Sequence, residues 1–580
     1  MNHQTPRALR TPLRPTVFAC RALTLAMGLA LATSAAQAVP IDTGSDDLKL
    51  TFDNTVKYSA AARLKSASAP LLANPNLDDG DRNFSTGLIS NRVDLLSELD
   101  VVYAKRYGLR LSGAGWYDQV YNSSNDNPGF AGGAFPNQTS VPADRFTAAT
   151  KRLHGRKTDL LDAFVFASVD LGESRASFRL GRHTLLWGES LFLGVNAIAA
   201  GMAPVDAIKL ISVPNTQFKE AIRPVPQVSG QLQITPDLSV GAYYQFKWEA
   251  NRLPAVGSYF SGSDANPDGG EQVLLPGLFT NPALRQADQK AKNSGQGGVQ
   301  LRLRADETDY GLYAIRFHSK VHQQVTVLNA VPVFLGPGVC PAPDFISTPG
   351  GCLTVGPAGY RLAYHQGITA FGGSASRTFG DVNAAVEASI RHNQDLASAG
   401  AAVDLSALGL GGANNSSDPG YAVGKTAHIN VSALWTLPQT PLFSEGNFMG
   451  EVAWNRLLSV TKNPAALDRN ATRDAYAIRM QIEPLYRQVA GGLDLGVPIG
   501  LGYSPRGSRS AVLGPALPPE NGGDLTLGLN ATYLDAWRFS LAYTHYFGRE
   551  ATLLDSNNAF SYQQYLKDRD FIAFSVRRTF

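Results

Sequence analysis

The chain has 580 residues, with 51 Lys and Arg against 48 Asp and Glu and a formal net charge of +3. The four arginines within the first 38 residues account for that excess, because 47 basic and 48 acidic residues follow them. The rest of the chain therefore has no excess of positive charge with which to bind a nucleic acid. No later segment approaches the roughly 18 consecutive apolar residues that a membrane-spanning helix needs. Almost no 3.6-residue periodicity is found either, so one closed sheet explains this length better than several soluble domains.

The first 38 residues have the three parts of a secretory signal peptide. The positive region contains Arg7, Arg10, Arg14 and Arg21. An apolar stretch over 22–36 follows, and Ala36-Gln37-Ala38 is a small-x-small cleavage site. We therefore expect residues 1–38 to be removed on export and residues 39–580 to form the mature protein.

Apolar and polar residues alternate in segments that recur from residue 48 to the end of the chain. This period of two is that of a strand whose two faces meet different surroundings. In 238–248, for example, Val240, Tyr244 and Phe246 lie on an apolar face opposite Ser239 and Tyr243. The expected strands are 48–58, 93–103, 109–117, 160–171, 175–183, 227–235, 238–248, 297–305, 309–318, 366–379, 382–392, 425–436, 447–456, 475–483, 493–503, 524–533, 537–547 and 570–580.

The connections between these segments alternate between short turns, such as Gly380-Asp381, and long loops rich in Gly, Pro, Asn and Ser. That alternation is typical of bacterial outer-membrane barrels, which have short periplasmic turns and long extracellular loops. The fold we expect is an all-β, transmembrane, antiparallel β-barrel of about 18 strands in the outer membrane of a Gram-negative bacterium. A soluble β-sandwich also alternates, but it predicts shorter and more even loops.

The last ten residues form one of these alternating segments and end in an aromatic residue. Ile572, Phe574, Val576 and Phe580 share the apolar face, on which Arg578 is an exception. A terminal aromatic residue on such a strand resembles the signal with which outer-membrane barrels are handed to their assembly machinery. We expect Phe580 to be that signal, and its strand to pair with the strand that begins near Leu48 and so to close the barrel.

Charged side chains on the faces opposite the apolar ones must line the lumen. The lumen and selectivity candidates are Arg92, Asp94, Glu98, Arg110, Arg175, Arg179, Arg302 and Arg304, and Glu387 and Glu451 add negative charge. Mixed charge indicates a wet lumen, since unpaired charges are too costly in a dry one. Two interpretations stay open: a transverse field that selects a solute, or simple solvation with Arg–Asp pairs that brace neighbouring strands.

The connection 184–225 is the least loop-like of the long connections, because it is apolar and partly helical in pattern. Pro204 is placed to open a short helix over 205–211. We expect this segment to fold into the barrel as a constriction or plug, and the alternative is a packed extracellular loop. The candidate residues in or beside it are Arg182, Trp187, Glu189, Asp206 and Arg223.

Cys340 and Cys352 are the cysteines that remain after the signal peptide, and they lie in a Gly- and Pro-rich stretch. In an oxidising compartment they are expected to form a disulfide that closes a small loop. Two free thiols, or a metal site, are the alternatives.

Several motifs resemble those of a proteobacterial family known as domain-of-unknown-function family 1302. They are Gly181-Arg182, Trp187-Gly188-Glu189-Ser190, Pro204-Val205-Asp206, Arg223-Pro224-Val225-Pro226 and 242–248. The family is regarded as outer-membrane and porin-like, and its members often sit beside exporters of the resistance-nodulation-division superfamily. The resemblance implies movement of an apolar or amphipathic compound across the envelope, and it brings no catalytic residues.

No Gly-x-Ser-x-Gly elbow and no His-Glu-x-x-His motif is present, so we do not expect an enzyme, a cofactor or a metal site. The function expected is a passive or gated porin-like channel for small solutes. The alternatives are a non-conducting partner of an inner-membrane exporter, and a lipid hydrolase on the barrel wall. The expected partners are outer-membrane lipid, the assembly machinery and an unidentified solute. The solute, the direction of transport and the oligomeric state stay open.

Overall fold

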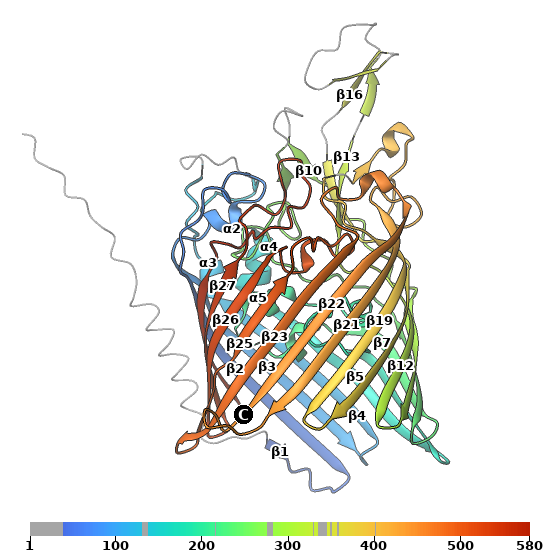
Figure 1. Cartoon of the computed structure of the whole chain (residues 1–580), viewed down its shortest axis with the longest axis vertical. Helices are drawn as coiled ribbons and strands as arrows, with labels where there is room; N and C mark the ends of the chain where they lie inside the picture. The colour runs from blue at the N-terminus through green and yellow to red at the C-terminus, as the bar shows by residue number, and fades with distance from the viewer. Residues whose placement is uncertain are drawn as a thin grey trace, which may run out of the picture.

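The computed structural model describes residues 39–129, 137–214, 216–274, 282–328, 330–333, 345–348, 351–355, 359–400 and 402–580. In this part of the chain, tilted antiparallel strands close into one barrel (Figure 1). The sheet contains 20 elements but 18 barrel strands, because β24 and β25 are two pieces of one strand and β1 (Val39–Ile41) is a short extra strand beside β2. The expected all-β barrel of about 18 strands is confirmed.

The barrel strands follow one another around the wall in chain order. They are β2 (Leu48–Arg63), β3 (Gly87–Tyr103), β4 (Tyr107–Asp118), β5 (Arg156–Leu171), β6 (Ser174–His183), β7 (Val225–Gln233), β8 (Leu238–Gln245), β11 (Gln296–Ala305), β12 (Thr308–Phe317), β18 (Ile368–Phe379), β19 (Val382–Asp395), β21 (Val423–Leu437), β22 (Glu445–Lys462), β23 (Asp474–Ala490), β24 with β25 (Leu493–Gly496 and Ile499–Ser504), β26 (Gly522–Tyr533), β27 (Trp537–Phe547) and β28 (Phe571–Thr579).

The last strand closes the barrel against the first, as the sequence predicts. β28 pairs with β2 from Thr55 opposite Thr579 to Arg63 opposite Phe571. Phe580 extends this ladder, because its backbone amide and that of Asn54 each donate to the other residue's carbonyl at 2.9 and 2.8 Å. The barrel therefore has no open edge along this seam.

The short turns, β1 and the C-terminus lie at one end of the barrel, and the long connections lie at the other (Figure 1). Consecutive positive φ angles at Ala104 and Lys105, and at Asp306 and Glu307, give the tight turns that suit the twist of paired strands. The long connections are 64–86, 119–155, 184–224, 246–295, 318–367, 396–422, 463–473, 505–521 and 548–570.

Short elements occur within the long connections. The helical ones are α2 (Asp79–Arg82), α3 (Gln119–Asn122), α4 (Ala148–Thr150), η2 (Lys151–Gly155), η3 (Ile198–Gly201), α5 (Ala207–Ser212), α6 (Phe218–Ala221), η4 (Ser406–Leu408), η5 (Pro464–Ala466) and η6 (Gly514–Ala516). The strands are β9 (Gln272–Val273), β10 (Ala283–Arg285), β13 (Gln323–Val327), β17 (Gly359–Ala363) and β20 (Val403–Asp404) in one small sheet, and β14 (Ala330–Val333), β15 (Phe345–Thr348) and β16 (Gly351–Val355) in another.

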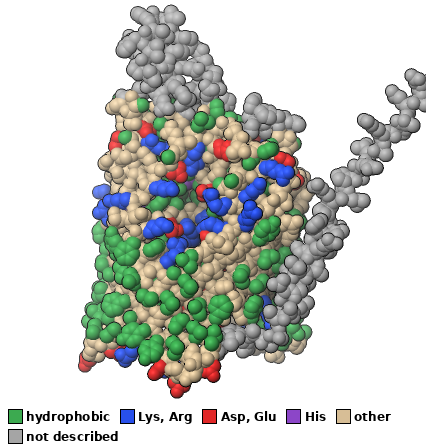
Figure 2. Space-filling model, turned by 180° about the vertical axis from the view of Figure 1, so that it is seen from behind, with side chains coloured by type: hydrophobic (Ala, Val, Ile, Leu, Met, Phe, Trp, Pro, Cys, Tyr) green, Lys and Arg blue, Asp and Glu red, His purple; other side chains and the backbone are tan. Residues whose placement is uncertain are grey.

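The two faces of the wall differ as the alternation predicts. Hydrophobic side chains gather in a band over the half of the wall nearer the short turns, with charged side chains above this band and at the rim below it (Figure 2). On β8, Tyr244 is 42% exposed on the outer face, whereas Tyr243 is 6% exposed on the inner face. Such a band is the surface that a barrel presents to lipid. Among the described residues, no helix is long and apolar enough to cross a membrane.

Strand lengths differ from the prediction at the end with the long loops. β3 begins at Gly87 instead of 93, because buried polar residues such as Ser90 and Asn91 continue the ladder above the apolar band. The strand predicted over 493–503 is broken between β24 and β25, where Pro498 has no amide hydrogen to donate. The predicted signal peptide (1–38) and Cys340 lie outside the described residues, as does the side chain of Cys352, so the disulfide stays a prediction.

Candidate functional site

The connection between β6 and β7, residues 184–224, lies against the inner face of the barrel; we call it the inserted segment. Its partners are side chains that alternate with outward apolar ones along their strands. Glu387 and Glu451, for example, are buried, whereas their neighbours Val386 and Val452 are exposed on the outer face. These contacts put the inserted segment inside the barrel.

Two inward carboxylates hold the first part of the inserted segment. Glu451 on β22 accepts from the hydroxyl of Ser190 at 2.7 Å and from the backbone amides of Phe192 and Leu193 at 2.5 and 2.7 Å. Glu387 on β19 accepts from the amides of Glu189 and Ile198, at 2.9 and 2.5 Å. Charge-assisted bonds of this kind are stronger than neutral ones, so both carboxylates are anchors of the segment.

Further wall residues satisfy the backbone of the inserted segment. Arg391 on β19 donates from Nη2 to the carbonyls of Asn196 and Ala197, both at 2.8 Å. The Asn196 side chain donates to Asn430 at 2.9 Å, and His428 lies 3.0 Å from its Oδ1. These bonds pair two backbone carbonyls and the Asn196 side chain, which would otherwise be buried without partners, a costly state.

A lysine from the long connection after β12 holds the next part of the segment. Lys320 donates from Nζ to the carbonyl of Gly201 at 2.7 Å and is buried. Burial lowers the pKa of Lys320 to about 7, because the charged ammonium loses its hydration without a carboxylate in contact.

Trp187 anchors the segment through apolar contact. Its ring packs edge-on against Tyr243, with centroids 5.1 Å apart, and stacks over Tyr313 at 6.2 Å. Ile198 and Met202 of the same segment complete this buried cluster with inward residues of β12 and β18. Trp187, a predicted constriction residue, is therefore a packing residue and does not face open solvent.

The segment returns through the helix α5, which begins after Asp206. The Asp206 carboxylate caps the helix by accepting from the amide of Lys209 at 3.1 Å. The sequence predicted a helix over 205–211, but the capping carboxylate sets the start at Ala207, two residues later. Arg252 bridges Asp206 to Asp159 on β5, at 2.6 and 2.7 Å.

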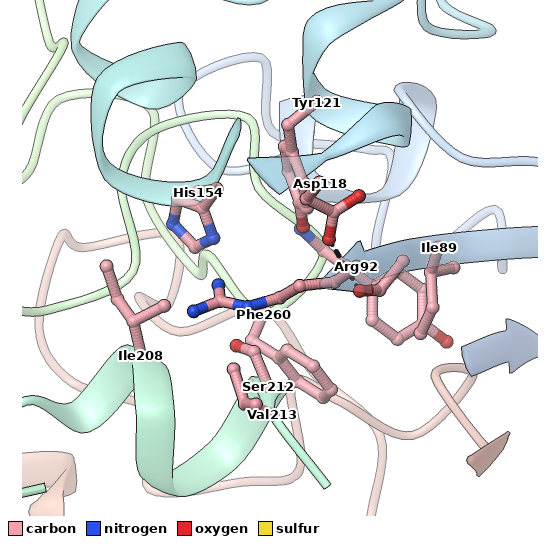
Figure 3. Close-up of a pocket in the computed structure, with 11 residues that line it drawn as sticks. Ile89, Arg92, Asp118, Tyr121, His154, Ile208, Ser212, Val213 and Phe260 are labelled. Atoms are coloured by element: carbon pink, nitrogen blue, oxygen red, sulfur yellow. Dashed lines mark hydrogen bonds between the residues drawn. The ribbon is translucent and has the colours of Figure 1, made fainter. Parts of the chain in front are cut away.

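The returning helix covers part of the wall and leaves only a small cavity of about 10 Å³ there. Figure 3 shows Arg92 and Asp118 from the wall, His154 from the loop before β5, and Ile208 of α5 around it. Arg92 and Asp94 form a buried pair at 2.6 Å, and Arg92 lies over the Trp116 ring at 4.8 Å. Arg92 and Asp94 thus lie in the wall beneath the segment and do not line an open lumen.

The end of the inserted segment contacts the opposite side of the barrel from its first part. Lys57 on β2 donates to the carbonyl of Pro214 at 3.4 Å, and Lys219 is paired with Glu98 on β3. Glu98 also binds Arg110, at 2.5 Å. β3, which binds Lys219, lies nine of the 18 strands away from β19, which holds the first part through Glu387, so the segment crosses the lumen.

The remaining predicted residues fall into two groups. Arg182 and Arg223 both bind Glu249, at 3.0 and 2.6 Å, where the inserted segment leaves β6 and rejoins β7. Arg175, Arg179, Arg302 and Arg304 are exposed, and on their strands they alternate with the exposed apolar residues of the outer face. The Glu189 carboxylate is close enough to Arg302 and Asp309 to interact with both electrostatically. The inserted segment therefore lies near the exposed arginines.

Some important contacts were not singled out from the sequence. Lys320, Arg252 and Asn196 lie in loops, where no alternation indicates which way a side chain points. A serine–histidine contact was also missed: Ser229 and His183 are 2.8 Å apart, but the other ring nitrogen of His183 lies 3.1 Å from the Gly181 carbonyl. The second ring nitrogen therefore faces a carbonyl where a catalytic pair would have an orienting carboxylate, and burial of Ser229 and His183 leaves no open path for a substrate.

Together, the closed barrel, its apolar band and the segment across its lumen define an outer-membrane-type β-barrel. The chain belongs to the family described as "Protein of unknown function (DUF1302)", whose model matches residues 19–580, and this confirms the resemblance seen in the sequence. A search of the curated proteins finds no match.

Several solved outer-membrane barrels are similar to the chain in fold. OccAB3 of Acinetobacter baumannii is 9% identical with a TM-score of 0.39, over 92% of this chain and 99% of that one. OpdK of Pseudomonas aeruginosa, solved with vanillate, is 11% identical with a TM-score of 0.36, over 92% and 98%. OmpF of Salmonella typhi, in complex with daunomycin, is 9% identical with a TM-score of 0.34, over 92% and 98%. These identities and scores are too low to transfer function.

Proposed function

We propose that the protein is an outer-membrane channel for small solutes, in which the inserted segment is the constriction. The observation that carries this proposal is the course of residues 184–224, which are bonded to Glu387 on one side of the lumen and, through Lys219, to Glu98 on the other. A segment held at both sides narrows the passage. Its anchors are buried and mostly hydrogen-bonded, so the constriction keeps one shape.

The exposed arginines favour a solute with negative charge. Arg179 and Arg302 lie on β6 and β11, which are three strands apart on one side of the barrel. Opposite charge comes from Glu189 on the segment and from Asp309. A field between the two signs orients a dipolar or anionic solute as it passes. An amphipathic compound with an anionic group fits this lining.

A liposome-swelling assay tests the proposal. Vesicles containing the purified protein are diluted into isotonic solutions of two small amphipathic solutes that are matched in size but opposite in charge. We expect swelling above that of empty vesicles, and faster swelling with the anion. No swelling with any solute, even when residues 190–220 are replaced by a short Gly/Ser linker, would contradict a channel and favour a non-conducting partner of an exporter. Release of fatty acid from the vesicles would favour a hydrolase.

A further inference from the structure

Three carboxylates from two extracellular loops meet above the barrel, away from the inserted segment. Asp78 and Asp79 stand at the start of α2, in the loop after β2, and Asp264 lies in the loop after β8. One oxygen from each lies within 4.8 Å of the others. The group is built into the fold, since Asp264 Oδ2 accepts from the amides of Asp78 and Asp79 at 2.8 and 3.3 Å.

Among the residues that the structure describes, Arg82 is the one cation in contact with this group, and it does not balance the charge of three carboxylates. Asp78 and Asp264 are buried, and Asp78 is paired with Arg82 at 2.5 Å. Arg145 lines the cavity beside Asp79, but it is half-exposed. Three carboxylates against one paired arginine leave two negative charges, which a divalent cation neutralises.

Unpartnered oxygens point to a missing ligand at the same place. The Asp264 side chain is fully buried, yet its Oδ1 atom has no hydrogen-bond partner within the described ranges. Gln138 donates to the Asp264 carbonyl at 2.7 Å, and its own Oε1 is buried without a donor, as is Oδ1 of Asn137. Buried acceptors of this kind are costly unless they bind a proton donor or a cation.

We propose that Asp78, Asp79 and Asp264 bind a calcium ion. Calcium takes six to eight oxygen ligands at about 2.4 Å, so two ligands on opposite sides of the ion are up to about 4.8 Å apart. The three carboxylates meet this limit. The adjoining cavity of about 30 Å³, lined by Asp79, Asn137 and Gln138, has room for water ligands. The ion would tie together the loops 64–86, 119–155 and 246–295 over the mouth of the barrel.

Isothermal titration calorimetry with calcium chloride tests the site on the full-length barrel in detergent after removal of metals by EDTA. We expect one saturable site with a Kd in the range of about 10⁻⁴–10⁻³ M typical of extracellular sites. Asp79→Asn, which has nearly the same shape, should weaken binding about tenfold or more. Asp144→Asn is the matched control, because Asp144 is an exposed carboxylate in one of the same loops.

Thermal unfolding gives a second readout that does not depend on the heat of binding. Calcium should raise the Tm of the wild type and of Asp144→Asn but not that of Asp79→Asn or Asp264→Asn. In EDTA, Asp79→Asn should melt at the same temperature as the wild type or higher, since it removes like-charge repulsion. The absence of saturable binding, equal binding by Asp79→Asn, or equal affinity for magnesium would each overturn the proposal. Folding of each variant is checked by its heat-modifiable migration on a gel.

Discussion

The Oε2 atom of Glu451 lies 2.5 Å from the backbone amide of Phe192. The same oxygen accepts from the amide of Leu193 at 2.7 Å, so one wall carboxylate holds consecutive amides of the inserted segment. A carboxylate in such a nest of amides is strongly bound, and removing it leaves several buried donors unpaired. The position of the constriction therefore depends on the wall of the barrel and not on the segment alone.

Replacement of this anchor should loosen the constriction without unfolding the barrel. In Glu451→Ala, the amides of Phe192 and Leu193 lose their acceptor, at a cost of about 1–3 kcal/mol for each unpaired group. We expect proteases to cut within 190–196 in the variant and not in the wild type, as measured by mass spectrometry of the fragments. Glu445→Ala is the control, because Glu445 lies on the same strand and is exposed. Equal resistance of both variants would show that Glu451 does not hold the segment.

Arg252 should contribute more to stability than a surface arginine does. It is buried between Asp206 and Asp159, so Arg252→Gln leaves the buried Asp206 without its cation, whereas Asp159 keeps its pair with Lys157. Loss of one partner of a buried ion pair costs about 3–5 kcal/mol. We expect a lower urea midpoint in lipid vesicles than for Arg106→Gln, which loses an exposed pair with Asp170. Equal midpoints would mean that water replaces the lost contacts.

Neutralisation of the lumen arginines should change ion selectivity. With Arg179→Gln and Arg302→Gln combined, the side of the lumen formed by β6 and β11 loses two exposed positive charges. The reversal potential in a salt gradient should shift toward cation preference. Lys105→Gln is the control, because it removes an exposed charge from a short turn at the end of the barrel. An unchanged reversal potential in the double variant would count against a selecting field.

His154 should make the barrel less stable in acid. It is buried against Tyr121 and accepts from the amide of Ala255 at 3.1 Å, and burial lowers its pKa from 6.5 to about 3. Between these values the unfolded chain binds a proton that the folded chain does not. His154 therefore leaves stability unchanged above about pH 6.5, and stability falls by up to about 1.4 kcal/mol per pH unit as the pH drops from 6.5 toward 3.

Urea unfolding at pH 7 and at pH 5 measures this effect. In His154→Gln, which keeps an acceptor for Ala255, the loss of stability between the two pH values should be smaller than in the wild type. His392→Gln is the control for removal of a less buried histidine. The same pH dependence in all three proteins would exclude His154 as its source.

The strands could be predicted from the sequence because lipid and lumen impose opposite polarity on alternate residues. Val386 and Val452 face outward while Glu387 and Glu451 face inward, as the alternation indicates. The alternation could not distinguish an open lumen from a covered wall. Arg92 and Asp94 point inward but lie under α5, and that cover depends on contacts between residues far apart in the chain.

Loop contacts had no comparable signal in the sequence. The helix start at Asp206 could have been predicted from its capping side chain, but its bond to Arg252 depends on how two loops meet. The carboxylates Asp78 and Asp264 are 186 residues apart in sequence and come together only in the folded mouth of the barrel. For the same reason, Lys320 gave no sign that it would bind the backbone of Gly201.

The most direct test of the account is single-channel conductance in planar bilayers. The wild type should give discrete steps, and the variant in which a short Gly/Ser linker replaces residues 190–220 should give larger ones, because the lumen is then no longer crossed. The Glu387→Ala, Glu451→Ala double variant should flicker between the two levels. Steps of equal size in the wild type and the linker variant, or no steps in either, would contradict a channel narrowed by the inserted segment.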